Sequence, residues 1–201
     1  GEGLASVDVK TKTATTTLGR VIEFEHLISS APLDRFLKLC DWKWDESLLT
    51  YNKVLCFNLG FDSKGPEDIH WAYIPEKKYP FYRVGFYDNI LGTDRMSLYV
   101  EIGLTADEDV DPEQQLQPVL EGLKASGIVT TQELVSHHSV ILDPAYVHIT
   151  AASKTLQQEV SATLGTRGIY SVGRYGGWTY CSIEDNVLEA RALAQRFNQV
   201  T

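Results

Sequence analysis

The chain has 201 residues, of which 43% are hydrophobic and 22% charged, a composition typical of a globular protein. Its formal net charge is −9 and its one basic pair is Lys77-Lys78, so we expect no broad nucleic-acid-binding surface. No apolar run approaches the roughly 18 residues that a membrane-spanning helix needs, so no membrane span is expected. Three widely spaced cysteines indicate reduced thiols in a cytoplasmic protein rather than a disulfide framework.

The first 40 residues predict strands followed by a helix. Residues 5–28 read as three β-prone runs, and the last of these would carry Ile22, Phe24 and Ile28 on one face. Ser30 and Pro32 then signal a helix start. The apolar face of this helix would be Leu33, Phe36, Leu37 and Cys40.

The middle of the chain predicts an antiparallel sheet. Four strands are expected at 53–61, 69–75, 81–87 and 97–104, with glycines and prolines between them. Short connections imply antiparallel pairing. Asp111-Pro112 begins a helix that Ser126-Gly127 ends, and residues 133–149 predict one or two further strands. We therefore expect an α+β fold, with a mainly antiparallel sheet of about six strands and helices on one side.

Aromatic and charged side chains gather on these predicted strands, among them Trp71, Tyr73 and Arg83. A sheet face with aromatics and one arginine suits a planar or sugar-like ligand that carries an anionic group. Arg83 and Gly85 share a face, and because glycine has no side chain we expect open space beside the guanidinium. Alternatively, the aromatics build the core and Arg83 pairs with Glu101.

The C-terminal segment reads as helix, strand, glycine-rich turn and helix. Residues 153–164 predict a short helix capped by Ser153, and 169–172 a strand that Gly173 ends. Ser182 opens the last helix with Asp185 three residues on, the spacing of a capping box. One face of that helix would be Ile183, Val187, Ala190, Ala194 and Phe197. Its start would offer free N–H groups to an electron-rich ligand edge; the alternative is an ordinary final helix packed on a sheet.

The residues of this segment resemble the C-terminal flavin-binding signature of the amine-oxidase-like flavoenzymes. That superfamily includes protoporphyrinogen oxidase and, more distantly, UDP-galactopyranose mutase. The matching positions are Gly173-Arg174-Tyr175-Gly176, Trp178, Tyr180, Ser182-Ile183-Glu184-Asp185 and Ala192. Two further stretches match in order: His26 to Leu33 is similar to the family's strand and Ser/Thr-x-Pro-Leu turn, and Trp71 to Arg83 to part of its substrate domain.

The resemblance implies an FAD cofactor and a small-molecule substrate, and it identifies no catalytic residue. No metal site is expected, because the adjacent His137 and His138 would point to opposite faces of a strand. The implied cofactor-binding residues are Gly173, Arg174, Tyr175, Gly176, Trp178, Ser182, Ile183 and Glu184. The implied substrate-binding residues are Trp71, Tyr73, Arg83 and Tyr180. Residues 1–32 would be a hairpin and strand of the FAD-binding domain, 33–150 the substrate-binding domain, and 151–201 the C-terminal strand and helix of an incomplete Rossmann-like FAD-binding domain.

Such flavoenzymes begin with a strand, a Gly-x-Gly-x-x-Gly turn and a helix, and this sequence contains no Gly-x-Gly-x-x-Gly. We therefore expect the substrate-binding and flavin-capping half of an FAD-dependent oxidoreductase, partnered by an N-terminal FAD-binding half in cis or as a separate chain. Alone it would be inactive, retain no FAD and self-associate through 5–28 or 168–198. Two alternatives stay open: a part of a nucleotide-sugar mutase, with Arg174, Tyr175 and Tyr180 on a diphosphate, and a non-catalytic binding module.

Overall fold

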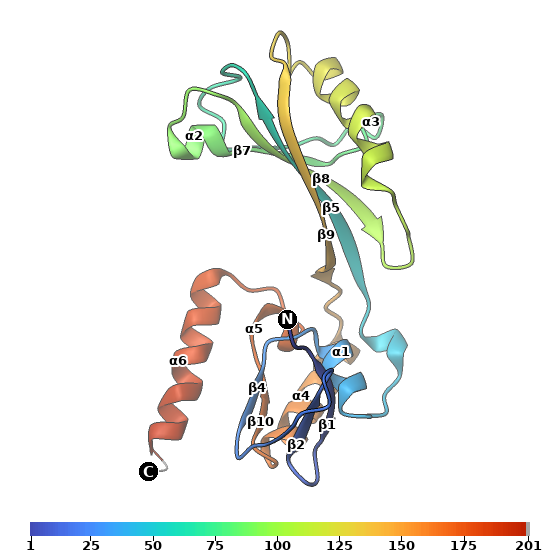
Figure 1. Ribbon diagram of the computed structural model, residues 1–201, viewed down its shortest axis with the longest axis vertical. Helices are drawn as coiled ribbons and strands as arrows, with labels where there is room; N and C mark the ends of the chain where they lie inside the picture. The colour runs from blue at the N-terminus through green and yellow to red at the C-terminus, as the bar shows by residue number, and fades with distance from the viewer. Residues whose placement is uncertain (200–201) are drawn as a thin grey trace. The chain divides into compact units, whose positions relative to one another are not determined.

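The computed structural model describes residues 1–199, which divide into two compact units (Figure 1). The first unit consists of Gly1–Tyr51 together with residues 146–199, and the second of Asn52–Ala145. Residues 33–51, which the resemblance assigns to the substrate-binding domain, thus lie in the first unit.

The strands of the first unit form two small sheets. β1 (Leu4–Asp8), β2 (Thr13–Thr16) and β3 (Val21–Glu23) make an antiparallel meander. β4 (Leu27–Ser29) pairs instead in parallel with β10 (Ile169–Ser171).

The prediction of one strand over residues 22–28 was therefore wrong. The chain leaves the meander after β3, where the Phe24 N–H donates to the Lys12 carbonyl. It then joins β10, where the Leu27 N–H donates to the Gly168 carbonyl. Period-two alternation alone does not reveal this change of pairing partner.

The first core lies between these sheets and the helices α1 (Leu33–Leu39) and α4 (Ala151–Gly165). The other helical elements of this unit are the 3₁₀ turn η1 (Glu46–Leu48), α5 (Gly173–Gly176) and α6 (Ile183–Gln199). Leu33, Phe36 and Leu37 are buried, which confirms the predicted apolar face of α1. They cluster with Val160 and Leu164 of α4.

The helix α4 begins two residues before the predicted range, and its cap is Thr150 rather than Ser153. The Thr150 hydroxyl accepts from the Ser153 N–H at 3.0 Å, and the Ser153 hydroxyl accepts from the Thr150 N–H at 2.9 Å. Ser153 is thus the third residue of a capping box whose first residue is Thr150. Both hydroxyl residues satisfy backbone N–H groups that the helix itself leaves unpaired.

The capping box predicted for α6 is confirmed, and most of its predicted apolar face is exposed. Ser182 Oγ accepts from the Asp185 N–H at 3.1 Å, while Asp185 accepts from the Ser182 N–H and hydroxyl. Ile183 is 85% exposed, and Val187 is exposed as well. The helix packs against the rest of the first unit through buried Leu193 and through Phe197, whose ring lies 5.3 Å from that of Tyr170.

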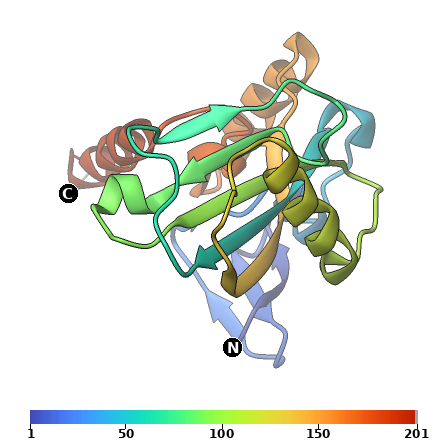
Figure 2. The ribbon, with the colours of Figure 1, turned by 90° about the horizontal axis from the view of Figure 1, so that it is seen from above.

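The second unit is one five-stranded sheet in the order β6-β7-β8-β5-β9. Its strands are β5 (Tyr51–Phe61), β6 (Trp71–Tyr73), β7 (Arg83–Phe86), β8 (Ser97–Thr105) and β9 (Leu134–Val147). A short helix that the sequence did not predict, α2 (Tyr87–Leu91), follows β7, and α3 (Pro112–Ala125) lies against the sheet (Figure 2). The predicted α+β class with an antiparallel sheet is confirmed.

One face of this sheet and α3 enclose the second core. Val119 and Leu123 of α3 are buried against the sheet residues Leu55, Phe57, Leu98 and Val100, among others. Gly122 allows the close approach, because a Cβ there would lie 2.8 Å from Cε1 of Phe81. No helix within residues 1–199 combines the length and the apolar character that crossing a membrane requires.

Thr150→Val should lower the free energy of unfolding by about 1 kcal/mol, because it removes the oxygen that caps α4 while keeping the side-chain shape. Thr155→Val is the matched control, since the Thr155 hydroxyl only donates to the Ala151 carbonyl inside the helix. Urea unfolding of the two variants measures the difference. Equal losses in both would contradict the role of Thr150 as the cap.

Candidate functional site

Two rows of cross-strand neighbours cross the sheet face opposite to α3. Alternate residues of a strand point to opposite faces, and the residues between these rows, such as Val84 and Val100, point into the core. The first row is Trp71, Gly85, Tyr99 and Asn58, and the second is Tyr73, Arg83, Glu101 and Cys56. The substrate-binding residues predicted in this unit are therefore brought together on one face.

Arg83 forms an ion pair with Glu101, its direct neighbour on β8. The Glu101 side chain is only 8% exposed, and it also accepts a hydrogen bond from the Tyr82 hydroxyl. The guanidinium carbon lies 5.5 Å from the ring centre of Tyr99 and 6.0 Å from that of Tyr73. The pairing considered as the alternative is thus present, and it offsets the positive charge that was expected to receive an anion.

The space beside Gly85 is filled, so the expectation of an open cavity there was wrong. A Cβ on Gly85 would lie 1.8 Å from Cε1 of Tyr99. Gly85 and Tyr99 are direct cross-strand partners, and the tyrosine ring lies over the strand where glycine leaves room. Tyr87 extends the stack, with its ring centre 5.2 Å from that of Tyr99.

The titratable groups of this face give it little net charge at neutral pH. Burial raises the pKa of the Cys56 thiol to about 11, and burial also raises the pKa values of Tyr87 and Tyr99. Cys56 is therefore a protonated thiol rather than a nucleophile. Trp71 and Tyr73 are 59% and 63% exposed, so their rings are the accessible apolar part of the face.

The glycine-rich turn of the first unit folds as the short helix α5, held at its start by side chains of α6. Gly173 has a φ of +80°, and its N–H donates to Oε2 of Glu189 at 2.7 Å. The Arg174 N–H donates to Oδ1 of Asn186 at 3.1 Å. Glycine at 173 fits because this left-handed conformation costs it little.

The guanidinium of Arg174, in α5, lies over the rings of two tyrosines. Its guanidinium carbon lies 5.0 Å from the ring centre of Tyr146 and 4.8 Å from that of the largely exposed Tyr180. Within residues 1–199 no carboxylate forms an ion pair with it. The charge of this arginine is therefore not offset as that of Arg83 is, and its N–H groups suit an anion.

The other predicted cofactor residues differ in what they expose. Ile183 and Glu184 are exposed at the start of α6, and Tyr175 is half-buried. Gly176 packs tightly, since a Cβ there would lie 3.0 Å from the Ser29 carbonyl oxygen. Trp178 is buried in the first core, with its ring 6.3 Å from that of Tyr51, so its side chain does not face a ligand. That part of the prediction is corrected: the Trp178 side chain belongs to the first core.

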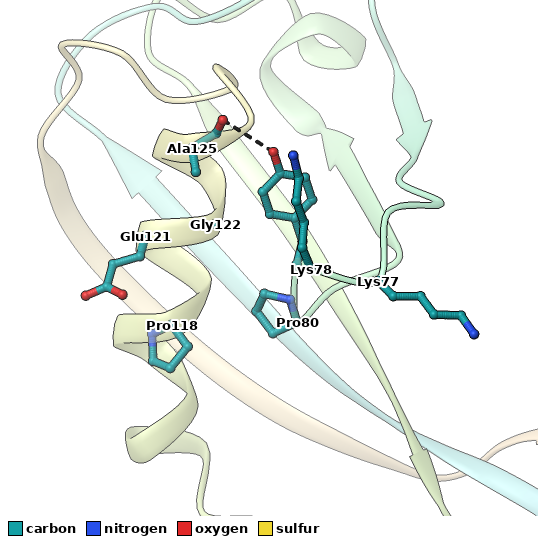
Figure 3. Close-up of a pocket in the computed structure, with 8 residues that line it drawn as sticks. Lys77, Lys78, Pro80, Pro118, Glu121, Gly122 and Ala125 are labelled. Carbon is teal, nitrogen blue, oxygen red and sulfur yellow. Dashed lines mark hydrogen bonds between the residues drawn. The ribbon is translucent and has the colours of Figure 1, made fainter.

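A separate hollow of about 570 Å³ lies between α3 and the loop that precedes β7 (Figure 3). Its lining is Lys77, Lys78, Tyr79, Pro80, Pro118, Glu121, Gly122 and Ala125. The Tyr79 hydroxyl donates to the Ala125 carbonyl at 3.3 Å and ties the loop to the helix. The hollow contains none of the predicted site residues.

No protein-family profile matches the chain, but its fold is found among solved structures. Among them are enzymes of the two kinds that the resemblance named. A reduced UDP-galactopyranose mutase matches with a TM-score of 0.77 and 24% identity, over 88% of this chain and 41% of that one. A putative protoporphyrinogen oxidase from Exiguobacterium sp. 255-15 matches at 0.72 and 17%, over 94% of this chain and 44% of that one.

An oxidoreductase from Methanosarcina mazei also matches, at a TM-score of 0.64 and 14% identity, over 97% of this chain and 49% of that one. The chain therefore spans less than half the length of each of these proteins. At such identities the likeness is one of fold, and that part of the predicted resemblance is confirmed.

Several residues that shape these sites were not identified from the sequence. They are Tyr146, whose ring lies 5.0 Å from the guanidinium carbon of Arg174, and Asn186 and Glu189, whose side chains accept hydrogen bonds from the start of α5. Such contacts join residues far apart in the chain, and periodicity reports only local neighbours.

Gly85→Ala should lower the free energy of unfolding by about 1–3 kcal/mol, because the added methyl group would displace the Tyr99 ring. Gly103→Ala is the matched control on the same face, since a Cβ there would lie 3.8 Å from Cε1 of Tyr82, an ordinary contact. Chemical denaturation of both variants tests this. If Gly85→Ala proved as stable as Gly103→Ala, Tyr99 would not be fixed over Gly85.

Arg83→Met should cost about 3–5 kcal/mol of stability, because it leaves the buried Glu101 carboxylate without its cation. The double variant Arg83→Met/Glu101→Leu should regain most of that loss, since both charges are then gone. Unfolding free energies for the wild type, the two single variants and the double variant form a complete cycle. Additive losses would show that the ion pair contributes nothing.

Proposed function

We propose that this chain is the substrate-binding and flavin-capping part of an FAD-dependent oxidoreductase. The observation that supports it is that residues 173–185, which resemble a flavin-binding signature, form a short helix and a capped helix start within a fold shared with a protoporphyrinogen oxidase and another oxidoreductase. A capped helix start suits an electron-rich ligand edge, because its first N–H groups have no partner within the helix.

The residues at this point fit a flavin. The Ser182–Asp185 cap leaves unused the N–H groups of Ile183 and Glu184, in the first turn of α6. The exposed Ile183 side chain adds an apolar surface for a ring. We assign FAD contacts to Gly173, Arg174, Tyr175, Gly176 and Ser182-Ile183-Glu184. FAD, when bound, supplies the redox chemistry, while the chain positions it and limits access to it.

We propose that the substrate lies on the face of Trp71 and Tyr73. Their exposed rings provide a stacking surface, and the Arg83–Glu101 pair beside them is close to neutral overall. Arg83 then acts by holding Tyr73 and Tyr99 in place, and the ring that stacks here is an uncharged part of the substrate. Tyr180 would serve together with Arg174, which has the positive charge that an anionic group needs.

The partner that we propose is an N-terminal FAD-binding half, in cis or as a separate chain. Parallel sheets normally have several strands covered on both faces, whereas β4 and β10 form a sheet of two strands. Ile28 of β4 and the Ile183–Val187 side of α6 are exposed beside it. A further nucleotide-binding layer would cover these side chains and would supply the pyrophosphate contacts.

The second candidate function is that of a nucleotide-sugar mutase. The specific observation in its favour is Arg174, an arginine that lies over the rings of Tyr146 and the exposed Tyr180 without a carboxylate partner within residues 1–199. A guanidinium in this setting can bind a diphosphate through two parallel hydrogen bonds. The fold shared with a UDP-galactopyranose mutase supports this candidate to the same extent as it supports the first.

We expect the purified 201-residue chain to be colourless after desalting, and the complete gene product to retain FAD in equal proportion to protein. The reason is that the proposed contacts involve one edge of the flavin, while the sequence contains no Gly-x-Gly-x-x-Gly turn to hold the pyrophosphate. Absorbance at flavin wavelengths and titration with FAD measure both. If the complete protein took up no FAD, the non-catalytic binding module would be the remaining interpretation. If the 201-residue chain retained FAD and was yellow, the flavin site would be complete without a partner.

A further inference from the structure

The strand β9 leaves a long edge of the second unit's sheet open. It stands last in the order β6-β7-β8-β5-β9, so only one side of its backbone is paired within the sheet. Several of its apolar side chains are exposed, with Val135 at 60% and Ile141 at 38%. An open edge of this kind is a template for the addition of another strand.

The opposite edge of the same sheet lacks these properties. β6 has three residues, and Pro75 and the Lys77-Lys78 pair follow it closely, features that hinder strand addition. In β9, by contrast, residues 134–142 read LVSHHSVIL, without Asp, Glu, Lys, Arg, Pro or Gly. Proteins commonly block strand addition with charged residues or proline, and this run contains neither. The sheet can therefore be extended at β9.

We propose that β9 pairs with β9 of a second copy of this chain, antiparallel about a two-fold axis through His138. A two-fold axis normal to the sheet keeps every side chain on its own face, and directly opposite residues of an antiparallel ladder point to the same face. The axis must therefore lie midway between the two copies of one residue, here His138. Centred on His138, the run is self-complementary: Leu134 of one copy lies opposite Leu142 of the other, and Val135 opposite Ile141. Apolar pairs thus flank a polar centre of histidines and serines.

The size and charge of this contact suit a dimer. Nine residues at about 3.3 Å each give a ladder of roughly 30 Å with about eight to ten backbone hydrogen bonds, close to the number in an ordinary interface. The net charge of −9 opposes association elsewhere, but no carboxylate lies within the run. Glu133 and Asp143 bound it and would face each other across the ladder, so the dimer should tighten as salt rises.

Sedimentation equilibrium of the 201-residue chain tests the proposal, with a charge exchange that reads the register. Val135→Lys/Ile141→Lys and Val135→Glu/Ile141→Glu should each weaken self-association at least tenfold, because like charges then lie opposite each other. A mixture of the two variants should form a heterodimer, because every such pair becomes one of opposite charge. Both positions are exposed, and circular dichroism melting verifies that the variants are folded.

The matched control is Val187→Lys/Leu188→Lys, which alters exposed apolar side chains of α6 and should leave the β9 dimer intact. The proposal is overturned if the chain is a monomer at all concentrations, if the lysine variant of β9 still dimerises, if the mixture forms no heterodimer, or if the α6 variant alone abolishes association. None of these outcomes bears on flavin binding, so the proposed function and this interface fail independently.

Discussion

The antiparallel pairing of β5 with β8 fixes which side chains of the second unit face its core and which face the opposite, exposed side of the sheet. Nine residue pairs, from Asn52–Thr105 to Gly60–Ser97, hold the two strands in one register. Because side chains alternate, this register sends Phe57 and Val100 to the core and places Cys56 opposite Glu101 on the other face. A shift by one residue would exchange the two sets, burying the carboxylate under α3 and exposing the core.

Sequence patterns were sufficient to predict those elements that depend on residues close together in the chain. The apolar face of α1, the Ser182–Asp185 cap and the strands of the antiparallel sheet follow from periodicity, from capping spacing and from turn residues. The split of residues 22–28 between two sheets does not, because it depends on β10 being available to β4 more than a hundred residues later. The exposed side of α6 has the same origin, since an amphipathic pattern does not say which partner covers it.

For the candidate site, the sequence identified the residues that gather on the face but not how they satisfy one another. Trp71, Tyr73 and Arg83 were correctly expected on one sheet. The absence of a side chain at Gly85 suggested a cavity. In a sheet, however, the side chain of the cross-strand neighbour can fill that space, and here the Tyr99 ring does so. A glycine in a strand thus indicates a close approach, and whether a ligand or a neighbouring ring makes it depends on the register.

The two arginines of the candidate sites share one packing arrangement and differ in charge compensation. Arg83 lies near Tyr73 and Tyr99, and Arg174 near Tyr146 and Tyr180, with ring distances between 4.8 and 6.0 Å. Stacking orders a guanidinium without using its in-plane N–H groups. At Arg83 the buried Glu101 accepts a hydrogen bond from Nη2 and offsets the charge, which makes the arginine part of the scaffold. At Arg174 no carboxylate within residues 1–199 does so, and the same geometry leaves a preorganised cation whose hydrogen bonds are available to a ligand.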